Sequence, residues 1–278
     1  MPEKARTTRE ELNLLLNQRG QEFDLARAAL ILAQDEYPAL DPKPYLDQID
    51  GLARRVEERI STGRDPIATI AALNGVLFEE EDFKGNSEEY YDPRNSFLNE
   101  VLDRRLGIPI TLSILYLEVA RRAHIPMAGI GLPGHFIVGL ISPGRTVYAD
   151  PFHQGQLMTV KECAERVAKI FDGQMPFLPE HLEPVDAPGI LFRLLTNLKN
   201  IYMESRSFAK GHSVIDKMIL LAPAEWAQVR DRGLVRYHLK HYQPALADLE
   251  LYLKNAPEAT DRSDILKLVK LIAKEMKA

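Results

Sequence analysis

The chain has 278 residues, 45% of them hydrophobic, which is enough to bury one large core or two smaller ones. Its 35 Lys and Arg against 40 Asp and Glu give a net charge of −5, which disfavours binding to nucleic acid or to an anionic membrane surface. The single cysteine, Cys163, excludes an internal disulfide and a cysteine-rich zinc site. Because the charged segment Met1–Gly20 lacks an apolar signal region, we expect a cytoplasmic protein without a membrane anchor.

The first 94 residues are predicted to form helices separated by prolines. Apolar residues recur at helical spacing in three segments, Phe23–Tyr37, Pro44–Ile60 and Pro66–Phe78. The next segment, Glu79–Pro93, has no apolar period and is predicted to be a loop. We therefore expect residues 1–94 to be the N-terminal helical section of a larger core.

A buried helix is predicted to begin at Pro109. Gly107 ends the short apolar segment before it, and proline suits a first helical position because its missing N–H has no partner there. One apolar stripe then runs along the helix, formed by Leu112, Leu115, Tyr116, Val119, Ala120 and Ala123. This is the clearest helix that the sequence predicts.

After Pro126 the pattern changes to short strands. The predicted strands are Met127–Leu132, His135–Ile141 and Thr146–Asp150, joined by turns at Pro133-Gly134 and Ser142–Arg145. If Ile141 pairs with Thr146 across the second turn, the numbers of paired residues sum to 287, and Asp150 lies opposite Ile137. A small antiparallel sheet then brings Asp150 diagonal to His135 on one face, at about 7 Å between backbone positions.

The C-terminal part shows a repeat of 34 residues. This spacing separates Phe208 from Tyr242, Gly211 from Ala245, Ile215 from Leu249 and Pro223 from Pro257. It is the period of the tetratricopeptide repeat, in which each unit is a pair of helices. We expect residues 187–278 to form a tail of such helical hairpins, and the fold class to be α+β and mostly helical.

The His135-Asp150 pair has two interpretations. An aspartate beside a histidine fixes the imidazole tautomer and raises its basicity, as in thiol and serine hydrolases. The same pair also occurs as a structural hydrogen bond. An enzyme requires His135 to face a cleft, whereas an enclosed His135 bonded only to Asp150 indicates a structural pair.

Four motifs resemble those of the bacterial SirB family. They are Asn95-Ser96-Phe97-Leu98-Asn99, Gly107-Ile108-Pro109-Ile110-Thr111-Leu112-Ser113, Pro133-Gly134-His135-Phe136 and Asp150-Pro151-Phe152. The resemblance runs from about Phe23 to Pro257. It implies a transglutaminase-like, papain-like core at residues 95–186 followed by a tetratricopeptide-like tail.

The resemblance also implies where a nucleophile would lie. In catalytic relatives a cysteine near a helix N-terminus is activated by a histidine and an aspartate on the following strands, and here that position holds Pro109. His135 and Asp150 match the base and orienting positions, which makes them the tentative catalytic residues. Thr111 and Ser113 lie on the first helical turn, where a hydroxyl either substitutes for the thiol or caps the turn.

The sequence is compatible with two functions. The first is a non-catalytic protein-binding or regulatory module, a pseudoenzyme whose partner is a protein. Its candidate binding residues are Asn95, Pro109, Thr111, Ser113, Phe136 and Phe152. The alternative is an atypical hydrolase or acyltransferase that uses His135 and Asp150 without a cysteine. The family name suggests a role in gene expression, which here would act through protein contacts because the chain has no DNA-reading helix or basic arm.

No cofactor or metal is expected from the sequence. A metal site would have to recruit His135, Asp150 and His153, but their spacing fits no established metal signature and His153 lies outside the family motifs. Cys163 lies in a helical segment after the sheet, and we expect its thiol to be buried and inert.

Overall fold

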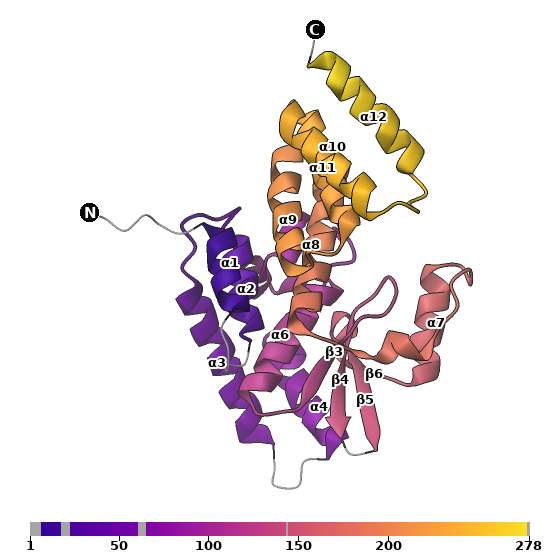
Figure 1. Cartoon of the computed structure of the whole chain (residues 1–278). Helices are drawn as coiled ribbons and strands as arrows, with labels where there is room; N and C mark the ends of the chain where they lie inside the picture. Colours follow the sequence, from indigo (N-terminus) through magenta and orange to yellow (C-terminus); the bar gives the residue numbers. More distant parts are fainter. Residues whose placement is uncertain (1–6, 18–22, 61–64, 143, 277–278) are drawn as a thin grey trace. The chain divides into compact units, whose positions relative to one another are not determined.

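The computed structural model describes residues 7–17, 23–60, 65–142 and 144–276. These divide into two compact units, Met1–Leu194 and Leu195–Ala278. Figure 1 shows the mostly helical first unit with its small sheet and the all-helical second unit. The predicted α+β fold class is therefore confirmed, while the predicted boundaries at residues 94 and 186 remain predictions.

The helical section of the first unit begins with four helices. They are α1 (Thr8–Leu16), α2 (Leu25–Ala33), α3 (Pro42–Arg59) and α4 (Pro66–Asn74). Side chains of Asp24, Asp41 and Asp65 accept hydrogen bonds at the starts of α2, α3 and α4, which explains where these helices begin. The three helical segments expected from the sequence are present, and α1 lies in a charged segment for which no helix was expected.

The predicted loop Glu79–Pro93 is partly wrong. A π-helical turn extends α4 over Gly75–Glu80, and Arg55 of α3 forms ion pairs there with Glu80 and Glu81. Further on, strand β1 (Lys84–Gly85) pairs in parallel with β2 (Leu106–Gly107). The predicted helix Pro66–Phe78 covers most of this turn, so only its last two residues were missed. The sequence pattern missed the strands because they are only two residues long.

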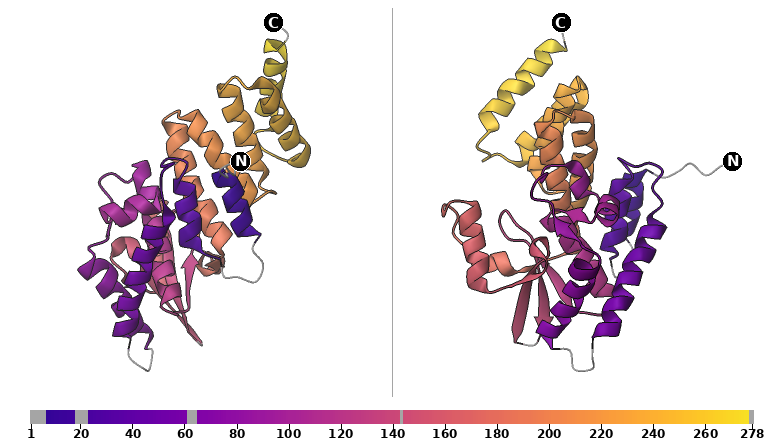
Figure 2. Two further views of the ribbon diagram at one scale, coloured as in Figure 1. Left: turned by 90° about the vertical axis from the view of Figure 1, so that its left-hand side faces the viewer. Right: turned by 180° about the vertical axis from the view of Figure 1, so that it is seen from behind.

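Helix α6 (Pro109–Arg122) begins at Pro109, as predicted, and twelve of its residues are buried. It follows the short helix α5 (Leu98–Arg104) and packs against α2 and α3, which lie beside it in the views of Figure 2. Because its sides are covered by helices and by the sheet, the helix lies in the core of the first unit.

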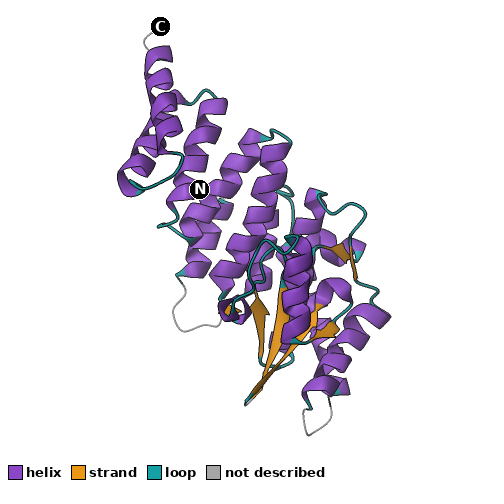
Figure 3. Ribbon diagram, turned by 90° about the vertical axis from the view of Figure 1, so that its right-hand side faces the viewer, coloured by secondary structure: helices purple, strands orange, loops and turns teal. Residues whose placement is uncertain are grey.

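A five-stranded antiparallel sheet follows, in the order β6-β5-β4-β3-β7. Its strands are β3 (Met127–Ile130), β4 (Ile137–Ser142), β5 (Arg145–Asp150), β6 (Gln156–Met158) and β7 (Pro184–Val185). Helices α4 and α6 pack on one face, and α7 (Val160–Ile170) covers the other (Figure 3). The α7 side holds a core of Ile137, Met158, Cys163 and their neighbours, which fixes α7 next to the ends of β4 and β5.

The second unit is built from antiparallel helices. Its helices are α8 (Ala187–Glu204), in which the division between the units falls, α9 (Phe208–Leu221), α10 (Trp226–His238), α11 (Tyr242–Asn255) and α12 (Arg262–Glu275). Buried Asp248 of α11 accepts ion pairs from Arg232 and Arg236 of α10, and Arg232 also reaches Asp216 of α9. These ion pairs, centred on one buried carboxylate, join three successive helices, as expected for stacked helical hairpins.

Candidate functional site

His135 lies in a tight turn just before β4, not at the start of the strand as predicted. Gly134 has a φ of +71°, and a Cβ atom at this position would lie 2.7 Å from Cγ2 of Ile170. Arg193 of α8 donates hydrogen bonds to the carbonyl oxygens of Leu132, at 2.5 Å, and of His135, at 3.0 Å. The left-handed glycine and the arginine together hold the turn out of the strand and fix the backbone of His135.

Asp150 ends β5 in the predicted register. Ile141 pairs with Thr146 and Val138 with Ala149, so the paired numbers sum to 287. The carboxylate is fully buried, and its Oδ2 lies 2.7 Å from Nε2 of His135. The expected diagonal contact between the two side chains is therefore present.

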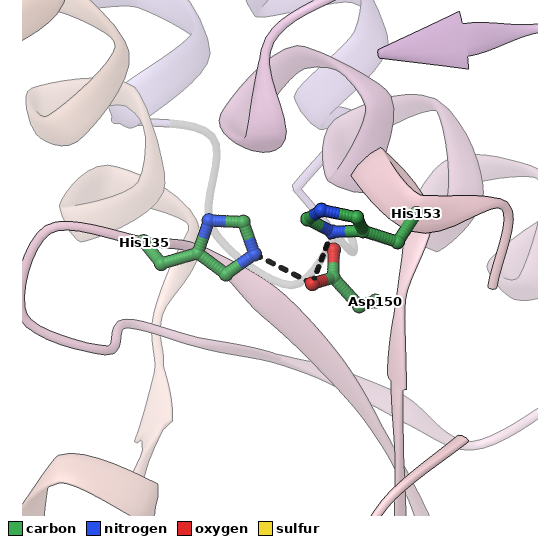
Figure 4. Close-up of side chains that lie close together, drawn as sticks. All are labelled: His135, Asp150 and His153. Atoms are coloured by element: carbon green, nitrogen blue, oxygen red, sulfur yellow. Dashed lines mark hydrogen bonds and ion pairs between the residues drawn. The ribbon is translucent and has the colours of Figure 1, made fainter. Parts of the chain in front are cut away.

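His153 joins this pair, although the sequence placed it there only in the disfavoured interpretation as a metal site. Its Nδ1 lies 2.9 Å from the same Oδ2 of Asp150, as Figure 4 shows. The 3₁₀ turn Pro151–His153 brings it there, since Asp150 caps the turn by accepting a hydrogen bond from Phe152 N at 3.1 Å. A sequence signal for the contact existed in Asp-Pro-Phe-His, because an aspartate before a proline starts such a turn and places the third following residue beside it.

A guanidinium group, that of Arg166 of α7, lies beside the cluster. Its Nη2 is 3.6 Å from Oδ2 of Asp150, and its Nη1 is 3.1 and 3.2 Å from the two ring nitrogens of His153. Burial alone would raise the pKa of Asp150, but the hydrogen bonds from His135 and His153 outweigh it and hold the pKa well below its ordinary value. Asp150 is therefore a carboxylate at neutral pH.

The two histidines differ in their exposure. The side chain of His135 is 6% exposed, whereas that of His153 is 40% exposed. His153 and Arg166 line a cavity of about 340 Å³ between β6 and α7, and His135 is not part of its lining. Solvent in this cavity therefore meets the cluster at His153.

Two further expected site residues, Thr111 and Ser113, lie near the start of α6, and their hydroxyl groups contact backbone atoms. Thr111 Oγ1 accepts a hydrogen bond from Ile108 N at 3.1 Å and donates one to the carbonyl oxygen of Asn95 at 2.8 Å. Ser113 Oγ is buried and lies 3.5 Å from the carbonyl oxygen of Phe136. No hydrogen bond joins either hydroxyl to His135 among the residues that the structure describes.

The remaining expected residues fall into two groups. The ring of Phe152 meets those of His135 and His153 edge-on, at centroid distances of 6.2 and 5.2 Å, so it walls the cluster. Asn95 instead bonds Asn86 and the loop before α5, and Phe136 is buried in the core. The structure therefore brings His135, Asp150 and Phe152 together and leaves the Asn95 side chain in a separate polar cluster.

The single thiol is not activated by its surroundings. Cys163 of α7 is buried in the apolar core on one face of the sheet, as expected. Burial raises the pKa of this thiol to about 11, and the negative charge of Asp150 adds to the effect. At neutral pH the thiol is protonated, so it does not replace the missing nucleophile.

Comparisons with known proteins agree with this architecture. Residues 43–196 match the family model of the transglutaminase-like superfamily, and residues 198–270 match that of the tetratricopeptide repeat. A UPF0162 protein of Xylella fastidiosa (strain 9a5c) is 36% identical over 252 residues, covering 88% of each chain. One from Vibrio cholerae is 28% identical over 251 residues, covering 87% of this chain and 91% of the relative.

A more distant relative shares only part of the chain. F-box only protein 21 of Mus musculus is 41% identical over 102 residues, which are 34% of this chain and 16% of that protein. No solved structure matches. With a transglutaminase-like core, a tetratricopeptide-repeat region and UPF0162 relatives along most of its length, the chain belongs to the transglutaminase-like superfamily and, within it, to the UPF0162 proteins.

Proposed function

We propose that this protein is a non-catalytic member of the SirB family that acts in the cytoplasm as a protein-binding module. The main support is that the position at which the family resemblance places a nucleophile holds Pro109, the first residue of α6, while His135 and Asp150 contact each other. Proline has no group that a base could activate. A histidine and an aspartate without a nucleophile still stabilise the turn and the strand end that carry them.

The other nucleophiles near the site support the same conclusion. Thr111 Oγ1 is held by two backbone groups, and Ser113 is fully buried. The Cys163 thiol lies in an apolar core and has a raised pKa. Among the described residues, no hydrogen bond joins any of the three to the imidazole of His135.

The second unit supports a protein partner. Tetratricopeptide hairpins stack into extended surfaces that bind protein segments, and residues 198–270 match that repeat. Helix α12 ends the stack and exposes Leu266 and Leu271, although Ile265 and Ile272 beside them are buried. Leu266 and Leu271 are therefore the side chains of α12 at which a contact with a protein partner can be tested. None of the described helices is long and apolar enough to cross a membrane.

The test is capture followed by direct titration. The full chain is immobilised, a partner is identified from cytosolic extract, and the purified partner is titrated against the wild type and against Leu266→Glu, Leu271→Glu and Leu157→Glu. Leu157 is the matched control, because it is an exposed leucine of β6 in the first unit. We expect saturable 1:1 binding that the two α12 variants weaken and Leu157→Glu leaves unchanged. A full chain that no purified partner saturates would contradict the proposal.

The second candidate is a hydrolase or acyltransferase that uses His135 with water as the nucleophile. The observation in its favour is the 2.7 Å contact between His135 Nε2 and Asp150 Oδ2, which is the contact that orients a general base. The low exposure of His135 weighs against it. Turnover that disappears in His135→Ala would favour the enzyme, and this variant does not touch the α12 surface.

A further inference from the structure

Three potential metal ligands meet around one carboxylate in the first unit. Nε2 of His135 and Nδ1 of His153 lie 2.7 and 2.9 Å from Oδ2 of Asp150 (Figure 4). One ligand atom from each residue lies within 4.8 Å of the other two. Two imidazoles and one carboxylate are a common ligand set for Zn²⁺.

The distances are close to those of a zinc site. Zinc lies about 2.0–2.2 Å from nitrogen and oxygen ligands, so a tetrahedral site separates neighbouring ligand atoms by about 3.4 Å. Around the ion, His135 Nε2 would therefore move away from Oδ2 by about 0.7 Å and His153 Nδ1 by about 0.5 Å. Small rotations of the side chains supply this movement. Asp150 Oδ1 keeps its hydrogen bond from Phe152 N, which holds the carboxylate in place.

The position of the cluster gives an ion both shielding and access. Asp150 and His135 are buried, whereas His153 is 40% exposed and lines the cavity of about 340 Å³ between β6 and α7. An ion could enter from this cavity and keep water as its fourth ligand there. We propose that His135, Asp150 and His153 form a Zn²⁺ site whose fourth position opens into this cavity. This proposal does not rest on the protein-binding function.

Arg166 is the group that competes with the ion. Its Nη1 lies at nearly equal distances, 3.1 and 3.2 Å, from both ring nitrogens of His153, and its Nη2 is 3.6 Å from Asp150 Oδ2. A guanidinium this close repels a divalent cation. It must swing into the cavity, whose lining also includes the carboxylates of Glu162 and Glu165. Removing the charge of Arg166 should therefore tighten metal binding.

Metal binding changes which ring nitrogens of the two histidines carry hydrogens. Without metal, His135 Nε2 and His153 Nδ1 each carry a hydrogen toward Oδ2. The ion needs lone pairs on these two atoms, so each neutral imidazole then carries its proton on its other ring nitrogen, and an imidazolium releases one proton to solvent.

The experiment titrates the metal-free full chain with Zn²⁺ by calorimetry and with Co²⁺ by visible absorption, which reports nitrogen coordination. Three variants accompany the wild type. His153→Asn removes a half-exposed ligand, Arg166→Gln removes the competing charge, and His241→Asn alters an exposed histidine outside the cluster. Circular dichroism checks that each variant is folded.

We expect one ion per chain, binding at least about tenfold weaker in His153→Asn and about tenfold tighter in Arg166→Gln, and unchanged binding in His241→Asn. Adventitious binding to surface histidines would leave His153→Asn at the wild-type affinity. That result overturns the proposal, as does the absence of saturable 1:1 binding in both the wild type and Arg166→Gln. Capture of a protein partner is measured separately, so either proposal can fail alone.

Discussion

Gly155, directly after the turn that carries His153, is the most sensitive glycine near the site. Its φ is +71°, and a Cβ atom there would overlap the side-chain amide of Asn74 at the end of α4. That amide donates to the carbonyl oxygen of Gly155 at 2.9 Å and accepts a hydrogen bond from the Tyr116 hydroxyl at 3.0 Å. Substituting Gly155 with alanine therefore strains the backbone and displaces Asn74 from both partners.

The cost follows from these contacts. A left-handed alanine costs about 1 kcal/mol, each lost hydrogen bond about 1 kcal/mol, and the forced repacking about 1 kcal/mol or more. We expect Gly155→Ala to destabilise the first unit by about 4 kcal/mol, which lowers its melting temperature by about 10 °C. Differential scanning calorimetry on the full chain measures this shift.

Gly173 supplies the matched control. Its φ is +73°, but nothing lies within 4 Å of a Cβ atom built there. Gly173→Ala should therefore lower the melting temperature by only about 3 °C, the cost of the backbone alone. Equal shifts for the two substitutions would refute the argument that Asn74 and Gly155 together hold the turn before β6.

Three further results are expected. Because the pKa of Asp150 is lowered in the folded state, its carboxylate stabilises the fold above its ordinary pKa of about 3.9, and this stabilisation is lost as the pH falls below that value. Urea unfolding of Asp150→Asn should therefore show a smaller free energy of unfolding at pH 7 and a flatter decline of that free energy into acid. An acid slope equal to that of the wild type would contradict this. Arg193→Met removes the arginine donor from the carbonyl oxygens of Leu132 and His135, although Leu132 keeps its hydrogen bond from His135 N. The loss should cost about 1–2 kcal/mol in the same assay, and a loss below about 0.5 kcal/mol would show that the arginine does not hold the turn. The Cys163 thiol, with a pKa of about 11, should react with a disulfide reagent at pH 8 far more slowly in the folded chain than in urea, and equal rates would place it outside the core.

The sequence predicted the sheet and the central pair because both depend on local rules. A four-residue turn set the register of β4 and β5, and Pro109 marked the first residue of α6. Alternation along the strands then placed His135 and Asp150 on one face. The start of β4 was wrong, since Gly134 and a distant arginine turn His135 out of the strand. The short edge strands β6 and β7 were not predicted, because two or three residues carry no alternating pattern.

The rest of the site depends on contacts between residues far apart in the chain. Arg193 reaches the His135 turn from 58 residues away, and Arg166 reaches His153 from the helix after the sheet. Neither has a local pattern that marks it. His153 is different, because its position three residues after Asp150 in a capped turn could have been recognised as a contact.

The central claim is that His135 and Asp150 have no nucleophile to activate. The most direct measurement is turnover of a panel of activated esters, peptide amides and γ-glutamyl amides by the metal-free wild-type chain and by metal-free His135→Ala. We predict that neither protein converts any of these substrates faster than buffer alone does. Hydrolysis or acyl transfer that the wild type catalyses and His135→Ala does not would contradict it.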